Sequence, residues 1–159
     1  NCGDLSKMTP KIIVYYPFVM KSECCISFVY IPQCEVPMST LLLITSAPSS
    51  IHAWHALGLA QALNAKQQPF RVFFYQDGVA VANNLQWVPD DQRNLMKEWQ
   101  KLEIKLPVCV SAALARGITD EENAKRHQID THNLAPQFEL VGLGELADAV
   151  QSTERLIQF

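Results

Sequence analysis

The first feature of this sequence that could carry chemistry is a thiol that stands apart from the others. Four of the five cysteines lie in the first quarter of the chain: Cys2, Cys24, Cys25 and Cys34. The fifth, Cys109, lies alone in the rest, between two valines. A thiol is a nucleophile only as its thiolate, whereas a free cysteine among apolar residues often serves as a small buried hydrophobe. Cys109 therefore has a catalytic and a packing interpretation.

Spacing argues against two common kinds of cysteine enzyme. A phosphatase- or rhodanese-like anion loop needs glycines and a closely spaced arginine, but the run from Cys109 to Arg116 contains no glycine and has a helical composition. A cysteine protease needs a histidine base. The four histidines qualify by type only: His52, His55, His127 and His132. The sequence assigns no catalytic dyad.

Resident cofactors are also not expected. His52 and His55 could share a metal on one helix, but no third ligand is evident, so we expect surface or packing histidines and no metal. Ser46, Pro48, Ser49 and Ser50 follow a predicted strand, where flavodoxin-like proteins bind phosphate. Without glycine this loop is a poor phosphate cradle, so a helix cap at Ser49 or Ser50 is favoured over flavin binding.

Several other polar and aromatic residues have an ordinary structural interpretation as well as a functional one. Asp77 could border the cysteine, although a turn-forming Asp before Gly78 is favoured. Arg116 could attract a persulfide or an acidic partner, or could be a solvated helix-end cation. Glu121 and Glu122 read as helix-cap residues. The three tryptophans are expected in the core or at a subunit interface: Trp54, Trp87 and Trp99.

The elements that must position Cys109 alternate between strand and helix. Apolar runs and aromatic or β-branched stretches predict strands at 41–44, 70–75, 106–110, 138–141 and 155–159. Helical spacing or composition predicts helices at 51–65, 95–102, 145–150 and from Ser111, and a capping box from Thr119 to Glu122 predicts another. Turns are expected at 76–78 and at Gly142 and Gly144. The predicted fold is a single α/β domain with a mainly parallel, flavodoxin-like five-stranded sheet and helices on both faces.

Cys109 then falls at a strand-to-helix junction, at the carboxyl edge of the sheet. Reactive groups gather at this edge in parallel sheets, and a helix amino terminus favours a thiolate. The position therefore predicts some activation of the thiol.

The bulk composition limits the classes of function. The 159 residues are 48% hydrophobic with a net charge of −3, which fits one compact domain and offers no continuous basic face for nucleic acid. No apolar run approaches the roughly 20 residues of a membrane span. Unpaired cysteine spacing predicts a reducing compartment, the cytoplasm. Residues 1–37 are rich in prolines and precede Met38, so we expect them to be a non-native or irregular extension, with the domain at 38–159.

Four blocks of this sequence closely resemble the DsrE-like sulfurtransferase family. They are Thr40–Thr45 (TLLLIT), Val72–Val79 (VFFYQDGV), Val108–Gly117 (VCVSAALARG) and Arg155–Phe159 (RLIQF), in the right order and at compatible spacing. The resemblance runs from about Met38 to Phe159. It implies that Cys109 carries sulfur as a persulfide in the relay that makes the 2-thio group of wobble uridine in certain tRNAs.

The resemblance also implies partners. Such a subunit would assemble with paralogous TusB-like and TusC-like subunits in a heterohexamer, receive sulfur from a TusA-like donor and pass it to a TusE-like acceptor that works with the thiouridylase MnmA. Because two protein sulfurs must touch, we expect Cys109 to be exposed or on a loop that opens. Two alternatives stay open: a DsrE-type subunit of a sulfur-oxidation complex, and a non-catalytic scaffold subunit in which Cys109 only packs.

Overall fold

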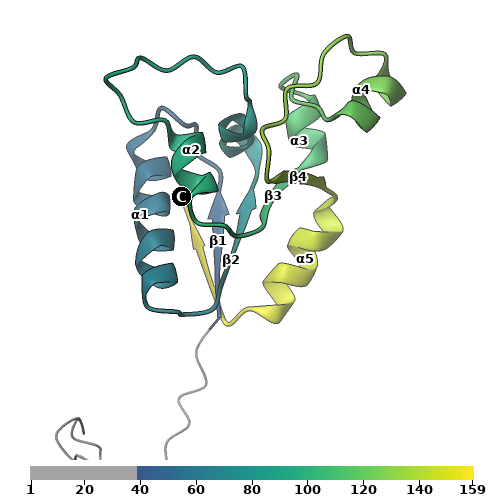
Figure 1. Ribbon diagram of the computed structural model, residues 1–159. Helices are drawn as coiled ribbons and strands as arrows, with labels where there is room; N and C mark the ends of the chain where they lie inside the picture. The colour runs from purple at the N-terminus through teal and green to yellow at the C-terminus, as the bar shows by residue number, and fades with distance from the viewer. Residues whose placement is uncertain (1–38) are drawn as a thin grey trace, which may run out of the picture. The chain divides into compact units, whose positions relative to one another are not determined.

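The computed structural model describes residues 39–159, which form one α/β domain around a five-stranded sheet (Figure 1). The extension predicted for residues 1–37 lies outside the described residues. All strand pairs are parallel and their order is β4-β3-β2-β1-β5. The strands are β1 (Thr40–Ile44), β2 (Phe70–Phe74), β3 (Leu106–Cys109), β4 (Phe138–Val141) and β5 (Arg155–Gln158). The predicted fold class and all five predicted strands are confirmed.

Helices cover both faces of this sheet. They are α1 (Ile51–Ala65), α2 (Leu95–Gln100), α3 (Val110–Leu114), α4 (Glu121–His127) and α5 (Leu143–Ser152), with a 3-10 helix, η1 (Gln76–Ala82). Phe74 of β2 packs edge-on against Trp99 of α2, whereas Arg71 of β2 contacts Glu145 and Ser152 of α5. Because side chains alternate along a strand, these contacts lie on opposite faces. In the described part of the chain, no helix is long and apolar enough to span a membrane.

Local capping explains where two of the helices begin. The side chain of Ser50 accepts a hydrogen bond from the His52 amide, which confirms the cap predicted before α1. The capping box predicted from Thr119 to Glu122 is wrong by one residue, because the cap of α4 is Asp120, which accepts from the Asn123 amide. Thr119 is instead fully buried, and its amide donates to the side-chain oxygen of Asn133.

Two predicted turns prove to be helical. Gly142 caps α5, and Gly144 lies inside that helix rather than in a turn. The turn predicted at 76–78 is the beginning of η1, whose Val79, Val81 and Ala82 are buried. The segment was misread because its first three residues, Gln76, Asp77 and Gly78, are typical turn formers, while its apolar side chains come later.

The three tryptophans differ in how deeply they are buried. Trp99 is completely buried in the core, as predicted, and Trp54 is half-buried with the Arg93 guanidinium 5.3 Å from its ring centroid. Trp87 is 82% exposed, so it does not lie in the core, and of the two predicted places only a subunit interface stays open for it. The connection from η1 to α2 that carries Trp87 lies outside the packed layers.

Gly78 determines how closely η1 lies to the sheet. A Cβ atom at this position would lie 2.2 Å from the carbonyl oxygen of Ile44, the last residue of β1. The Gly78 amide also donates to the Thr45 carbonyl at 3.2 Å. Only glycine fits this contact between two backbones, and the contact seats η1 against β1, β3 and α3.

We expect Gly78→Ala to lower the free energy of unfolding by about 2–3 kcal/mol, because the methyl group must displace backbone atoms. Gly58→Ala is the matched control, since Gly58 lies exposed within α1 with no atom within 4 Å of the added Cβ. That change should stabilise the protein by about 0.5–1 kcal/mol. Urea unfolding of both variants measures the difference. Equal stability of the two variants would show that η1 does not depend on this contact.

Candidate functional site

Cys109 is the last residue of β3 and the N-cap of α3. Its backbone is extended, with φ −60° and ψ 115°, and the chain turns directly from strand into helix. β3 lies between β2 and β4, and Cys109 pairs with Val141. The predicted strand-to-helix junction at the carboxyl edge is confirmed, although α3 has only five residues and so offers a short helix dipole.

The thiol is not exposed, so the expectation of surface exposure is wrong. Cys109 is 1% exposed and belongs to the hydrophobic core, and the other three residues of β3 are buried as well. The helix η1, which the sequence did not predict, contacts both β3, which ends at Cys109, and α3, which begins after it. Cys109 also ends a strand rather than sitting on a loop. Any reaction with a second protein therefore requires this edge to open.

An ion pair bridges the two short helices beside Cys109. Arg116, just beyond α3, donates from Nη2 and Nε to Oδ1 of Asp77 in η1, at 2.6 and 3.2 Å. Its Nη1 also donates to the Ala112 carbonyl at 3.1 Å. The sequence pattern does not relate Asp77 to Arg116, and the structure brings them together. They link the surface of the η1–α3 seam, the contact between these two helices.

Asn133 ties this seam to the segment that carries α4. It is 7% exposed, and its Oδ1 accepts from the Thr119 amide while its Nδ2 donates to Oδ1 of Asn83. Its own amide donates to the Thr119 carbonyl, and its carbonyl accepts from the Asn84 amide. Sequence reasoning missed Asn133, because an isolated asparagine between helix and strand carries no periodic signal. These four hydrogen bonds close the base of the segment 119–133 and fix the end of η1 to it.

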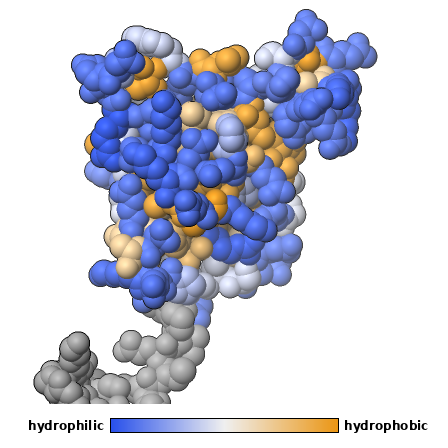
Figure 2. Space-filling view, in the orientation of Figure 1, coloured by the Kyte–Doolittle hydropathy of each residue, from blue (hydrophilic) through white to orange (hydrophobic). Residues whose placement is uncertain are grey.

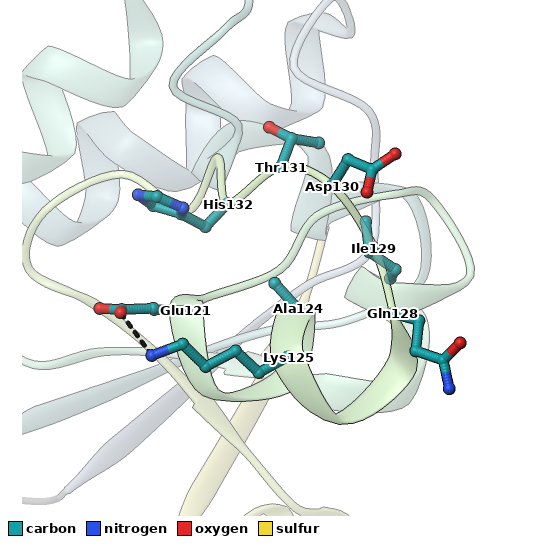
Figure 3. A pocket seen from close by; sticks show the side chains of 8 residues that line it. All are labelled: Glu121, Ala124, Lys125, Gln128, Ile129, Asp130, Thr131 and His132. Carbon is teal, nitrogen blue, oxygen red and sulfur yellow. Dashed lines mark hydrogen bonds and ion pairs between the residues drawn. The ribbon is translucent and has the colours of Figure 1, made fainter.

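A hollow on the segment that carries α4 is lined by other residues than Cys109. It has a volume of about 380 Å³ and lies between α4 and the segment that follows it (Figure 3). Six of the eight residues that line it have polar side chains, and the Glu121–Lys125 ion pair lies at one side of it. Glu121 and Glu122 are not caps, since they pair with Lys125 and Arg126 one turn later. This arrangement stabilises an exposed helix and offers no group to Cys109.

The histidines do not form a reactive group with the thiol. The rings of His52 and His55 lie 6.3 Å apart, centre to centre, in the first turns of α1. Within residues 39–159, no three side chains of the metal-binding types lie close enough to hold an ion. None of the hydrogen bonds formed by these residues joins a histidine to Cys109.

Shifted carboxyl groups also lie elsewhere. The hydrogen bond from Lys101, and then that from Arg93, lowers the pKa of Glu98 on α2. The hydrogen bond from Lys125 lowers the pKa of Glu121 on α4. Both are ordinary responses to a neighbouring cation, so they identify no acid or base at the seam.

We expect Asp77→Asn to raise the rate at which iodoacetamide alkylates Cys109 in the folded protein about two- to fivefold. Exposed ion pairs typically contribute about 0.2–1 kcal/mol, and losing this one favours opening of the seam by that amount. Glu121→Gln removes a more exposed pair, on α4, and should leave the rate unchanged. Peptide mass spectrometry distinguishes Cys109 from the other cysteines. Unchanged alkylation in Asp77→Asn would rule out the seam as the route to the thiol.

Comparison with known proteins agrees with this architecture. The crystal structure of the YchN protein from E. coli superposes with a TM-score of 0.62 at 22% identity, over 77% of this chain and 99% of that one. At this identity the likeness establishes the fold alone.

Relatives with higher identity carry a functional name. Sulfurtransferase TusD of Pectobacterium carotovorum is 43% identical over 77% of this chain and 99% of its own length. Sulfurtransferase TusD of Serratia proteamaculans is 43% identical over 74% and 96%, and the TusD homolog of Vibrio cholerae is 38% identical over 76% and 97%. The DsrE/DsrF-like family matches residues 38–159. This protein therefore belongs to the DsrE/DsrF-like family, as the four sequence blocks predicted.

Proposed function

We propose that this protein is a sulfurtransferase that carries sulfane sulfur as a persulfide on Cys109. The observation that carries the proposal is the place of Cys109, the sole cysteine of residues 39–159, at the carboxyl end of β3 in a relative of proteins named sulfurtransferase TusD. The donor is a TusA-like protein and the acceptor a TusE-like protein that works with MnmA in 2-thiolation of tRNA. The proposed setting is the cytoplasm, where thiols stay reduced.

The proposed chemistry is two successive thiol exchanges. The Cys109 thiolate attacks the outer sulfur of the donor persulfide, the S–S bond of the donor breaks, and the donor cysteine leaves as a thiolate. The acceptor thiolate then attacks the outer sulfur held on Cys109, and Cys109 leaves as a thiolate. One sulfur atom moves in each step without net oxidation, so neither step needs a metal or an organic cofactor.

Burial gives this carrier a closed resting state. A persulfide beneath the η1–α3 seam would be shielded from reductants and from unrelated thiols. Transfer then requires the seam to open, which it does transiently in the free protein and for longer when a partner binds. TusB-like and TusC-like subunits in a heterohexamer are the proposed neighbours, and the domain at 38–159 carries the whole proposed activity.

The burial of Cys109 also favours a second candidate. A thiol that is 1% exposed in an apolar core is what a non-catalytic scaffold subunit would show. The two candidates differ in whether Cys109 ever accepts sulfur.

We expect the full chain to gain one sulfur, about 32 Da, on incubation with a cysteine desulfurase, cysteine and a TusA-like donor. Reductant should reverse the gain, and the Cys109→Ser variant should lack it. Cys34→Ser is the matched control, because it removes one of the other thiols and should load like the parent. Intact-protein and peptide mass spectrometry provide the measurement. If the chain gains no sulfur from a loaded donor with TusB-like and TusC-like subunits present, the proposed carrier function is wrong and the scaffold subunit is the remaining candidate.

A further inference from the structure

Two large apolar side chains stand in solvent on the connection from η1 to α2. Leu85 is 69% exposed and Trp87 is 82% exposed, the two highest values among the exposed large hydrophobic residues of the described chain. Tryptophan is among the residues that contribute most to binding at protein interfaces. A single exposed leucine needs no explanation, but a tryptophan beside it on one short segment points to a binding surface.

This connection lies at the end of the sheet where Cys109 lies. It leaves η1, which contacts β3 and α3, and runs along the carboxyl edge before it reaches α2 (Figure 1). Figure 2 shows apolar patches along this end of a largely hydrophilic surface. A protein bound to the connection would thus meet the same end of the molecule as the η1–α3 seam.

Both ends of the connection are held in place. Oδ1 of Asn83 accepts from the Leu85 amide at 3.0 Å and from Nδ2 of Asn133 at 3.1 Å. At the other end, Arg93 donates to Glu98 of α2 at 2.9 Å and lies over the Trp54 ring. Holding the apolar side chains on fixed ends lowers the entropy cost of binding.

The charges near these side chains select the kind of partner. Asp90 and Asp91 are exposed and, among residues 39–159, form no ion pair. Of the three cations beside them, Arg93 and Lys101 pair with Glu98, and Lys97 is left with no ion pair among these residues. A hollow of about 280 Å³ lies beside them, between this connection and α2. In a two-fold contact with a second copy, the acidic side chains of both copies would come together, which is unfavourable. A basic surface with an apolar centre fits better.

We propose that Leu85 and Trp87 anchor the protein that delivers sulfur to Cys109, and that Asp90 and Asp91 face basic residues of that donor. This inference rests on the proposed function, because it names the docking surface for the same transfer. The donor is a persulfide-bearing protein with an apolar patch rimmed by lysine or arginine. Its contact with the connection places its sulfur at the edge where Cys109 is covered.

The test compares a protein donor with a small one. The double variant Leu85→Ser, Trp87→Ser and the parent chain are each loaded from a persulfidated TusA-like protein and from glutathione persulfide. We expect the double variant to lose at least tenfold in the second-order rate of transfer from the protein donor and to keep the parent rate with glutathione persulfide. The control variant Leu143→Ser, Val150→Ser removes two other exposed apolar side chains, on α5, and should match the parent with both donors.

Three results would overturn the docking surface. The first is a double variant that accepts sulfur from the protein donor at the parent rate. The second is a double variant that loses the same factor in rate with both donors. The third is a double variant whose assembly mass differs from that of the parent in light scattering, which would make the connection a subunit interface. Failure of the proposed function looks different, because the parent chain itself would then accept sulfur from neither donor.

A separate measurement tests the role proposed for Asp90 and Asp91. We expect the parent rate from the protein donor to fall as ionic strength rises, since exposed charges are screened beyond about 10 Å at 0.1 M salt. The Asp90→Asn, Asp91→Asn variant should transfer more slowly at low salt and depend less on salt. The same salt dependence in both chains would overturn the basic character assigned to the donor.

Discussion

The contact of Gly78 with the Ile44 carbonyl is the constraint on which the candidate site depends. It allows the backbone of η1 to lie directly against the end of β1, where any side chain would collide. From that position η1 reaches β3 and α3, and the carboxyl edge around Cys109 is closed. The end of η1 also supplies Asn83 and Asn84, to which Asn133 attaches the α4 segment. One glycine thus sets both the cover of the thiol and the base of the neighbouring segment.

Burial and the proposed sulfur transfer make opposing demands on this edge. A covered Cys109 is shielded from solvent and from small thiols, but thiol exchange requires two sulfurs to meet along an open path. The Asp77–Arg116 ion pair is compatible with both demands, because an exposed ion pair contributes little to the stability of the closed state and forms and breaks readily. By contrast, the contact between Gly78 and β1 is a backbone packing contact deep in the fold. The seam can therefore open at its surface while η1 keeps its place on β1.

The sequence predicted what depends on local pattern and missed what depends on distant contacts. The apolar run at 41–44 and the helical spacing at 51–65 each match one observed element, because burial of a strand or of one helix face leaves a periodic trace. The 3-10 helix left no such trace, since Gln76, Asp77 and Gly78 resemble a turn and the reason for Gly78 lies in β1. The burial of Cys109 could not be predicted for the same reason, because η1, which contacts the strand and the helix on either side of Cys109, left no periodic trace in the sequence.

Local stability is unevenly distributed around the thiol. All of β3 and most of β1 are buried in the sheet, whereas α4 buries only Ala124. The helix α4 is stabilised mainly by two exposed ion pairs, each between residues one turn apart and each contributing about 0.2–0.5 kcal/mol. The connection at 83–94 likewise exposes most of its side chains and is held chiefly at its two ends. Segments with little burial open at the lowest free-energy cost. The edge that covers Cys109 is thus bordered by segments with little burial, so a partner that binds there opposes only weak interactions.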